Sequence, residues 1–284
     1  MKNKYCRLSL LMIFQLFIAT AFSQELYVFI EPASNVPAKS IGLKYSKKAI
    51  KETVFGHSHT SNRHMLETQF GLNKKWAIRP SITFSDMYTE RKMKFESVGF
   101  NVKYRFLSID DVHKHFRVAY FLKGVISSNN LRYEELTSEG DQTAIETGFI
   151  FTQLIHKLAI SATAGLNEVV DEERWAKLAG PRNYGLESFN YSLSAGYLLF
   201  PRKYTSFNQP NFNIYCEFLG SRGLDRNVSF LDIAPALQVI VRSNTKVNFG
   251  YRFQVAGQMN RMSSTGFVFS FEKTFLNALK KKFS

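Results

Sequence analysis

Long apolar runs and cysteines are scarce in this sequence of 284 residues. After Phe22 no stretch of 18 apolar residues occurs, which excludes a bundle of membrane helices, since each helix needs about 20 such residues. The two cysteines are Cys6 and Cys216. Because Cys6 lies in a leader that we expect to be removed, we expect no intramolecular disulfide in the mature chain.

The first 24 residues have the composition of a secretory signal peptide. Three basic residues within the first seven precede the mostly apolar run 8–22, which is shorter than the roughly 20 residues of a membrane-spanning helix. The small residues Ala19, Ala21 and Ser23 stand at the end of this run, as a signal peptidase requires. We predict that residues 1–24 are cleaved after export; an uncleaved anchor is the alternative.

Aromatic residues and positive charge are both abundant. The chain has 27 Phe and 13 Tyr residues, which is many for a soluble domain but suits a barrel with an apolar outer face and aromatic belts at both membrane interfaces. The formal net charge of +14 raises the question of a nucleic-acid partner. The Lys and Arg residues are spread along the chain without a nucleic-acid-binding signature, so we expect no such partner.

The dominant pattern is an alternation of apolar and polar residues. In the segment 96–106 every second residue from Val98 to Phe106 is apolar, and the residues between them include Lys103 and Arg105. In a β-strand these two sets project to opposite faces. Eleven further segments repeat the pattern with varying clarity: 40–46, 63–72, 76–85, 116–126, 143–153, 158–166, 188–199, 211–219, 230–241, 246–255 and 267–272.

The links between these segments alternate in length. Counted from the N-terminus, the odd-numbered links are generally the longer ones: 47–62, 86–95, 127–142, 167–187 and 220–229. The even-numbered links include three tight ones: 73–75, 154–157 and 242–245. Along an even number of strands, this alternation is typical of outer-membrane barrels with both termini in the periplasm, and a soluble sandwich gives no reason for it.

We therefore predict an all-β fold, a transmembrane antiparallel β-barrel of about 12 strands, located in the outer membrane. The barrel spans residues 40–275. Residues 25–39 are expected to form a periplasmic lead-in, too short to be a plug, and residues 276–284 a basic C-terminal tail.

The signal peptide, the alternating strands and the terminal segment Gly266–Phe275 resemble Gram-negative outer-membrane barrels. Such barrels commonly end in an aromatic strand that the barrel-insertion machinery recognises. The entry into the first strand, PAKSIGLK at 37–44, resembles the transporter barrels grouped with the phenol-degradation MetA pathway. This resemblance implies passage of a small molecule and supplies no catalytic residues.

The candidate functional residues are the charged residues at strand positions expected to face the barrel interior. They are Lys44, Arg63, Arg79, Lys103, Arg105, Arg117, Lys123, Lys246, Arg252, Glu67, Glu146, Glu217, Asp232 and Glu272. Basic members outnumber acidic ones, and rings of Lys and Arg select anions, so an anion-preferring pore is one interpretation. Charges that pair across strands and fill a narrow barrel are the other, because 12 strands lie between filled and open barrels in size.

Two loops carry residues that could bind a metal ion. His57, His59 and His64 cluster at the predicted loop 47–62, and imidazoles this close could hold Zn²⁺ or Cu²⁺. Acidic residues in the loop 167–186 could bind Ca²⁺ or the cations that bridge lipopolysaccharide. Solvated loops are the alternative at both places, and we expect no cofactor.

Catalytic motifs such as G-x-S-x-G or H-E-x-x-H do not occur, so we do not expect an enzyme. We expect a channel or passive transporter for a small solute, with outer-membrane lipid, lipopolysaccharide and the insertion machinery as its other partners. The main alternative is a non-transporting structural or surface-binding barrel that presents its loops. An outer-membrane hydrolase is a third possibility.

Overall fold

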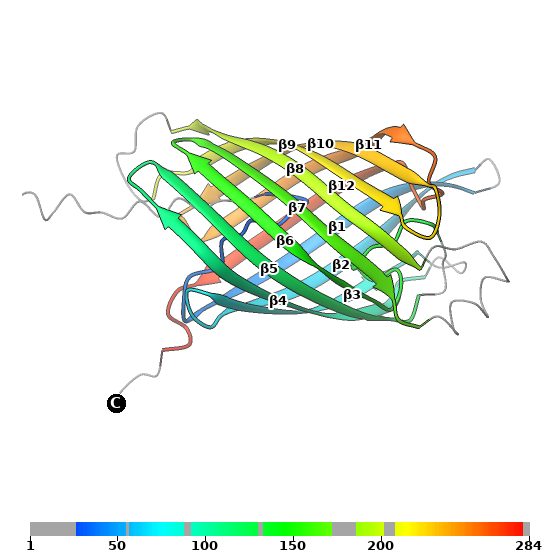
Figure 1. Ribbon diagram of the computed structural model, residues 1–284, viewed down its shortest axis with the longest axis horizontal. Coiled ribbons are helices and arrows are strands. Elements are labelled where there is room, and N and C mark those ends of the chain that lie inside the picture. Colours follow the sequence, from blue (N-terminus) through cyan, green and yellow to red (C-terminus); the bar gives the residue numbers. More distant parts are fainter. Residues whose placement is uncertain are drawn as a thin grey trace, which may run out of the picture.

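Twelve antiparallel β-strands close into one barrel (Figure 1). The computed structural model describes residues 27–54, 57–87, 92–129, 133–171, 186–201 and 208–280, with the backbone alone at 52–54 and 57–59. The strands are β1 (Ser40–Val54), β2 (His57–Gly71), β3 (Trp76–Ser85), β4 (Lys94–Asp110), β5 (Lys114–Ser127), β6 (Ala144–Ile155), β7 (Leu158–Val169), β8 (Glu187–Phe200), β9 (Asn211–Gly223), β10 (Ser229–Val241), β11 (Thr245–Gly257) and β12 (Thr265–Phe275).

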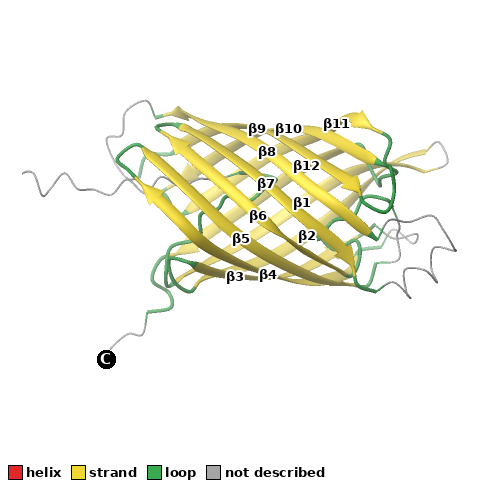
Figure 2. Cartoon of the chain, in the orientation of Figure 1, coloured by secondary structure: helices red, strands yellow, loops and turns green. Residues whose placement is uncertain are grey.

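Strands that follow one another in the chain pair with each other, and β1 closes the ring by pairing with β12 (Figure 2). The closing register runs from Ile41 opposite Phe275 to Ile50 opposite Gly266. Closure of this kind removes the free strand edges of an open sheet. β1 begins and β12 finishes at the same end of the barrel (Figure 1), which we call the terminal end; the opposite end is the far end.

Apolar side chains cover the outside of the barrel and polar ones point inward. Phe100 and Leu193 are each 50% exposed, whereas Ser194 and Asp232 are 0% exposed. Because successive strand residues point to opposite faces, the alternation in the sequence produces an apolar outer surface and an interior that holds most of the buried polar residues beside smaller apolar clusters. This is the reverse of a soluble sandwich. Within the described ranges, no helix is long and apolar enough to cross a membrane.

The predicted all-β antiparallel barrel of twelve strands is confirmed. The prediction of a loop at 47–62 is wrong, because β1 continues to Val54 and β2 already begins at His57. This hairpin reaches beyond the rest of the barrel at the far end (Figure 1). Strand residues beyond the lipid-facing part of a barrel do not contact acyl chains and can be polar. The polar composition of this segment therefore resembles that of a loop.

The links differ between the two ends. At the terminal end several are tight turns, such as 156–157 and 242–244, whereas the far end carries the longer links 128–143 and 258–264. Segments at both ends turn into the barrel and enclose a space inside it. These segments determine the candidate site.

Candidate functional site: a charged cavity inside the barrel

The N-terminal segment 27–35, which we call the strap, lies inside the barrel (dark blue in Figure 1). The carboxylate of Glu217 on β9 accepts hydrogen bonds from three consecutive backbone N–H groups, those of Val28 (2.8 Å), Phe29 (3.2 Å) and Ile30 (3.0 Å). Glu217 is 0% exposed, and a buried carboxylate without donors would be costly. The strap therefore satisfies Glu217, and Glu217 fixes the strap.

Basic side chains of the barrel wall hold the rest of the strap. The Lys103 ammonium donates to the carbonyl oxygens of Pro32 (2.8 Å) and Ser34 (2.7 Å), and the Arg117 guanidinium donates to the Ser34 hydroxyl (2.7 Å). An extended segment has backbone groups without strand partners, and here wall side chains supply them. Residues 25–39 were expected to form a periplasmic lead-in; residues 27–35 of this segment lie inside the barrel instead.

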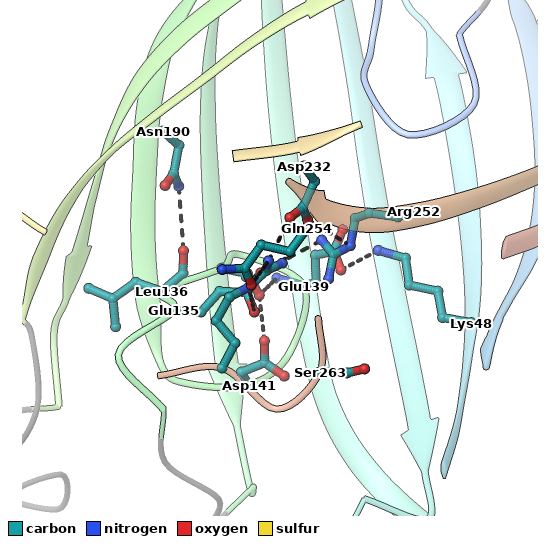
Figure 3. Close-up of polar contacts among 12 residues, drawn as sticks. Lys48, Glu135, Leu136, Glu139, Asp141, Asn190, Asp232, Arg252, Gln254 and Ser263 are labelled. Carbon is teal, nitrogen blue, oxygen red and sulfur yellow. Dashed lines mark hydrogen bonds and ion pairs between the residues drawn. The ribbon is translucent and has the colours of Figure 1, made fainter. Parts of the chain in front are cut away.

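At the far end, residues 133–141 of the link between β5 and β6 fold toward the barrel interior (Figure 3). We call this segment the latch; it contains four acidic residues and no basic one. Glu139 forms a hydrogen-bonded ion pair with Lys48 on β1, and Asp141 forms one with Arg63 on β2. Carboxylates of the latch therefore neutralise cations of the wall.

Arg261, in the link between β11 and β12, fixes the latch from the other side. It pairs with Glu135 of the latch (3.0 Å) and with Asp232 on β10 (2.7 Å), and its guanidinium lies 3.6 Å from the centroid of the Phe230 ring. Burial alone would lower the pKa of Arg261, but Glu135 and Asp232 outweigh it and raise this pKa above its ordinary value. Arg261 thus joins the latch to the wall as a permanent cation.

A β-bulge brings Glu96 to Arg63. In the pairing of β3 with β4 the register shifts after Thr83, which leaves Glu96 as the extra residue. An extra residue re-aims a side chain, and Glu96 is fully buried, accepting two hydrogen bonds of 2.8 Å from Arg63. Strict alternation from Val98 assigns Glu96 to the outer face, so sequence reasoning missed it.

A cavity of about 300 Å³ lies between the strap and the latch. Six basic and six acidic residues line it: Lys44, Lys48, Arg63, Arg79, Lys123, Arg252, Glu31, Glu67, Glu135, Glu139, Asp141 and Glu146. Most of them are paired, as Arg79 is with Glu31 and Lys123 with Glu146 (3.4 Å). The Lys44 ammonium forms no ion pair or hydrogen bond with another described residue. The cavity has both apolar and charged lining residues, its charges are balanced in number, and the strap and the latch border it.

The candidate residues named from the sequence occupy different places. Those lining the cavity are Lys44, Arg63, Arg79, Lys123, Arg252, Glu67 and Glu146. Lys103, Arg117 and Glu217 hold the strap, while Asp232 binds Arg252 (3.2 Å) and Arg261. Lys246 and Glu272 form a buried cross-strand ion pair of 2.8 Å. Arg105 lies at the terminal end, where it donates to the carbonyl oxygen of Lys74 (2.6 Å).

Sequence reasoning did not name Lys48 or the acidic residues of the strap and latch. Lys48 continues the inward alternation of Lys44 and Ser46, so a longer first strand would have included it. The latch offers a weaker signal, namely four acidic residues without a basic one in a long link.

The three histidines proposed as a metal site all belong to β2. His64 lies in β2, and its Nδ1 atom is 2.7 Å from the Tyr45 hydroxyl. His57 and His59 lie in the same strand, and their side chains lie outside the described set, so the metal site stays a prediction. Among the side chains that are described, no group of three possible metal ligands occurs.

Other expectations fall outside the described residues. They concern the signal peptide at 1–24 and most of the acidic loop 167–186, of which 172–185 are not described. The Ca²⁺ interpretation of that loop stays a prediction.

The sequence matches no family profile and no curated protein. Among solved structures, the COG4313 outer membrane channel from Pseudomonas putida F1 is similar at 12% identity and a TM-score of 0.54, over 87% of this chain and 100% of that one. The KdgM porin is similar at 8% identity and a TM-score of 0.48, over 82% of this chain and 99% of that one. The first likeness shows that this chain has the fold of an outer-membrane β-barrel.

Proposed function

We propose that this barrel is an outer-membrane channel that passes small solutes. The observation that carries the proposal is the charged cavity of about 300 Å³ on the inside of a closed barrel whose outside is apolar. A soluble barrel would gain nothing from an apolar outer surface, and a purely structural one would not need an unfilled space with charged lining residues inside. The strap and the latch narrow the proposed solute path through the barrel, one at each end of the cavity.

The outer membrane accounts for the exposed apolar side chains. In that setting both termini and the tight turns face the periplasm, and the hairpin of β1 and β2 faces outward, where it meets lipopolysaccharide. The aromatic strand β12 serves the insertion machinery. Transporter barrels grouped with the phenol-degradation MetA pathway are the family to which we assign the chain, on the resemblance of residues 37–44.

A preference for anions is a second, separate proposal. Among the fourteen wall residues named from the sequence, nine are basic and five are acidic, and a surplus of Lys and Arg in a pore favours anions. The strap and the latch bring in further acidic residues that cancel this surplus in the cavity. The preference is therefore weak while both segments are in place.

Conductance across a planar bilayer tests the channel. The purified barrel should give discrete current steps, and vesicles containing it should swell in arabinose. A closed membrane together with the absence of swelling would favour the structural or surface-binding alternative. Hydrolysis of phospholipid or peptide that disappears on serine or histidine substitution would favour the hydrolase.

Charge reversal tests the anion preference. Arg79→Glu combined with Arg105→Glu removes one cation from the cavity lining and one from the terminal end, and we expect the reversal potential in a KCl gradient to move toward cation selectivity. Arg242→Glu, in a turn between β10 and β11, is the matched control and should leave the reversal potential in place. An identical reversal potential in all three proteins would remove the anion proposal and leave the channel itself standing.

A further inference from the structure

Two cations of the wall lie directly opposite each other on neighbouring strands. Lys48 of β1 and Arg63 of β2 are register partners, and like charges in this position destabilise a sheet unless a counter-charge is present. Glu96 compensates Arg63 from β4. Lys48 receives its counter-charge from the latch, through Glu139.

A third cation faces the same space. Arg252 of β11 lies opposite Gly266 of β12, which in turn lies opposite Ile50 of β1. A side chain at Gly266 would meet only one atom within 4 Å, the carbonyl oxygen of Ala49 at 3.8 Å. The missing side chain therefore leaves open space between Arg252 and the strand that carries Lys48.

We propose that Lys48, Arg63 and Arg252 form a binding site for small dicarboxylate solutes, and that the latch occupies this site with its own Glu139 and Asp141. The inference rests on the proposed channel function and names a solute class for it. In Figure 3, Lys48 and Arg252 point from the wall toward Glu139. The two latch carboxylates stand in for the two carboxylates of a solute.

The backbone of the latch lets it place two carboxylates side by side. Gly140, between Glu139 and Asp141, has a φ of 132°, which L side chains rarely adopt. A Cβ atom there would come within 2.7 Å of the Ser97 hydroxyl, so the latch backbone lies against the wall. This close approach brings the acidic residue on each side of Gly140 to a basic partner.

One contact of the latch, the ion pair of Glu139 with Lys48, is accessible, whereas Glu135 and Arg261 anchor the latch in a buried pair. The Glu139 side chain is 41% exposed and the Lys48 side chain 22% exposed, so solvent and solute reach this ion pair. Partly exposed ion pairs contribute little net stability. A solute with two carboxylates can therefore compete first with Glu139 at Lys48 and then with Asp141 at Arg63, while Glu135 keeps the latch anchored at Arg261.

Isosteric neutralisation of the latch tests the site. In the double variant Glu139→Gln, Asp141→Asn, Lys48 and Arg63 lose the latch carboxylates that pair with them. We expect the chloride-to-potassium permeability ratio to rise about threefold or more, because one uncompensated charge about 7 Å from an ion in water-like surroundings changes its energy by about the thermal energy. Succinate should bind more tightly than to the unmodified protein, whereas succinamide should not bind. Glu134→Gln, in the same latch but paired with Arg226 (3.6 Å), is the matched control.

The remaining outcomes are equally decisive. Adding Lys48→Gln to the double variant should abolish the gain in succinate affinity. If the double variant does not fold, Lys48→Gln alone supplies a second test. This variant should raise the conductance without raising the chloride-to-potassium permeability ratio. Unchanged succinate affinity and an unchanged ratio in a folded double variant overturn the inference while arabinose passage still supports the channel. If no variant passes ions or arabinose, the proposed channel fails, and the solute site fails with it.

Discussion

The carboxylate of Glu217 accepts a 2.8 Å hydrogen bond from the backbone N–H of Val28, which lies 189 residues earlier in the chain. A group on the ninth strand therefore fixes the N-terminal segment inside the barrel. The strap is not one of the twelve strands, so this contact and those of Lys103 and Arg117 hold it in place inside the barrel.

Glu217→Gln should release the strap. The substitution removes the charge from three hydrogen bonds and turns one acceptor into a donor that faces N–H groups, which costs roughly 2 kcal/mol or more and raises the released fraction about thirtyfold. Single-channel conductance should increase. Asn213→Ala, on the same inward face of β9 but bonded to Gln238 rather than to the strap, is the control.

Labelling locates this effect in the strap. In a Cys216→Ser background, a cysteine at the fully buried Ala33 should react with a water-soluble maleimide only slowly. Glu217→Gln should accelerate the reaction and Asn213→Ala should not. Equal labelling rates in both would show that Glu217 does not hold the strap.

Gly250→Ala should displace the strap by steric overlap. A Cβ atom at Gly250 would lie 2.4 Å from Cε2 of Phe29, and overpacking of this kind costs about 1–3 kcal/mol. We expect higher conductance with the barrel intact, as judged by heat-modifiable migration on gels. Gly266→Ala, which points into open cavity space, is the matched control; the prediction fails if both variants conduct alike.

Acid should loosen the latch only at low pH. Burial acts to raise the pKa of Glu139, but the charge and hydrogen bond of Lys48, helped by Arg63, outweigh it and lower this pKa to about 2. Because the pKa is lower in the docked latch than in a released one, the stabilisation is complete above the ordinary value near 4.5 and is lost as the pH falls toward 2.

Conductance measured as a function of pH checks this dependence. It should stay level from neutral pH to about pH 5 and rise between the two pKa values. Glu139→Gln should remove the rise in conductance between these two pKa values. A rise of the same size and position in both proteins would assign the dependence to another group.

Leu193→Arg should weaken insertion of the barrel. Leu193 lies on the outer face of β8 and is 50% exposed, so in a bilayer an arginine there costs about 2–4 kcal/mol near the midplane. Refolding into vesicles across a urea series measures the change. Val112→Arg, in a turn at the terminal end where Val112 is 81% exposed, should have no effect. A stable Leu193→Arg barrel would contradict the membrane assignment.

Much of the fold could be predicted because alternation is a local property. Phe100 and Leu193 face outward as a direct consequence of strand geometry, whichever strands are their neighbours. The candidate site was predicted less completely. Arg63 and Arg79 line the cavity, but their acidic partners Asp141 and Glu31 come from segments that the sequence placed outside the wall.

The sequence alone determined twelve alternating strands, their order and their two faces, because a period of two residues follows from the extended backbone itself. Only the tertiary structure decided that the strap and the latch turn inward, that a bulge aims Glu96 at Arg63, and that the interior is balanced in charge. Polar residues in a link are compatible with bulk water and with a barrel interior alike. The choice between them depends on partners such as Glu217 and Lys48, which lie far away in the chain and come close only when the barrel closes.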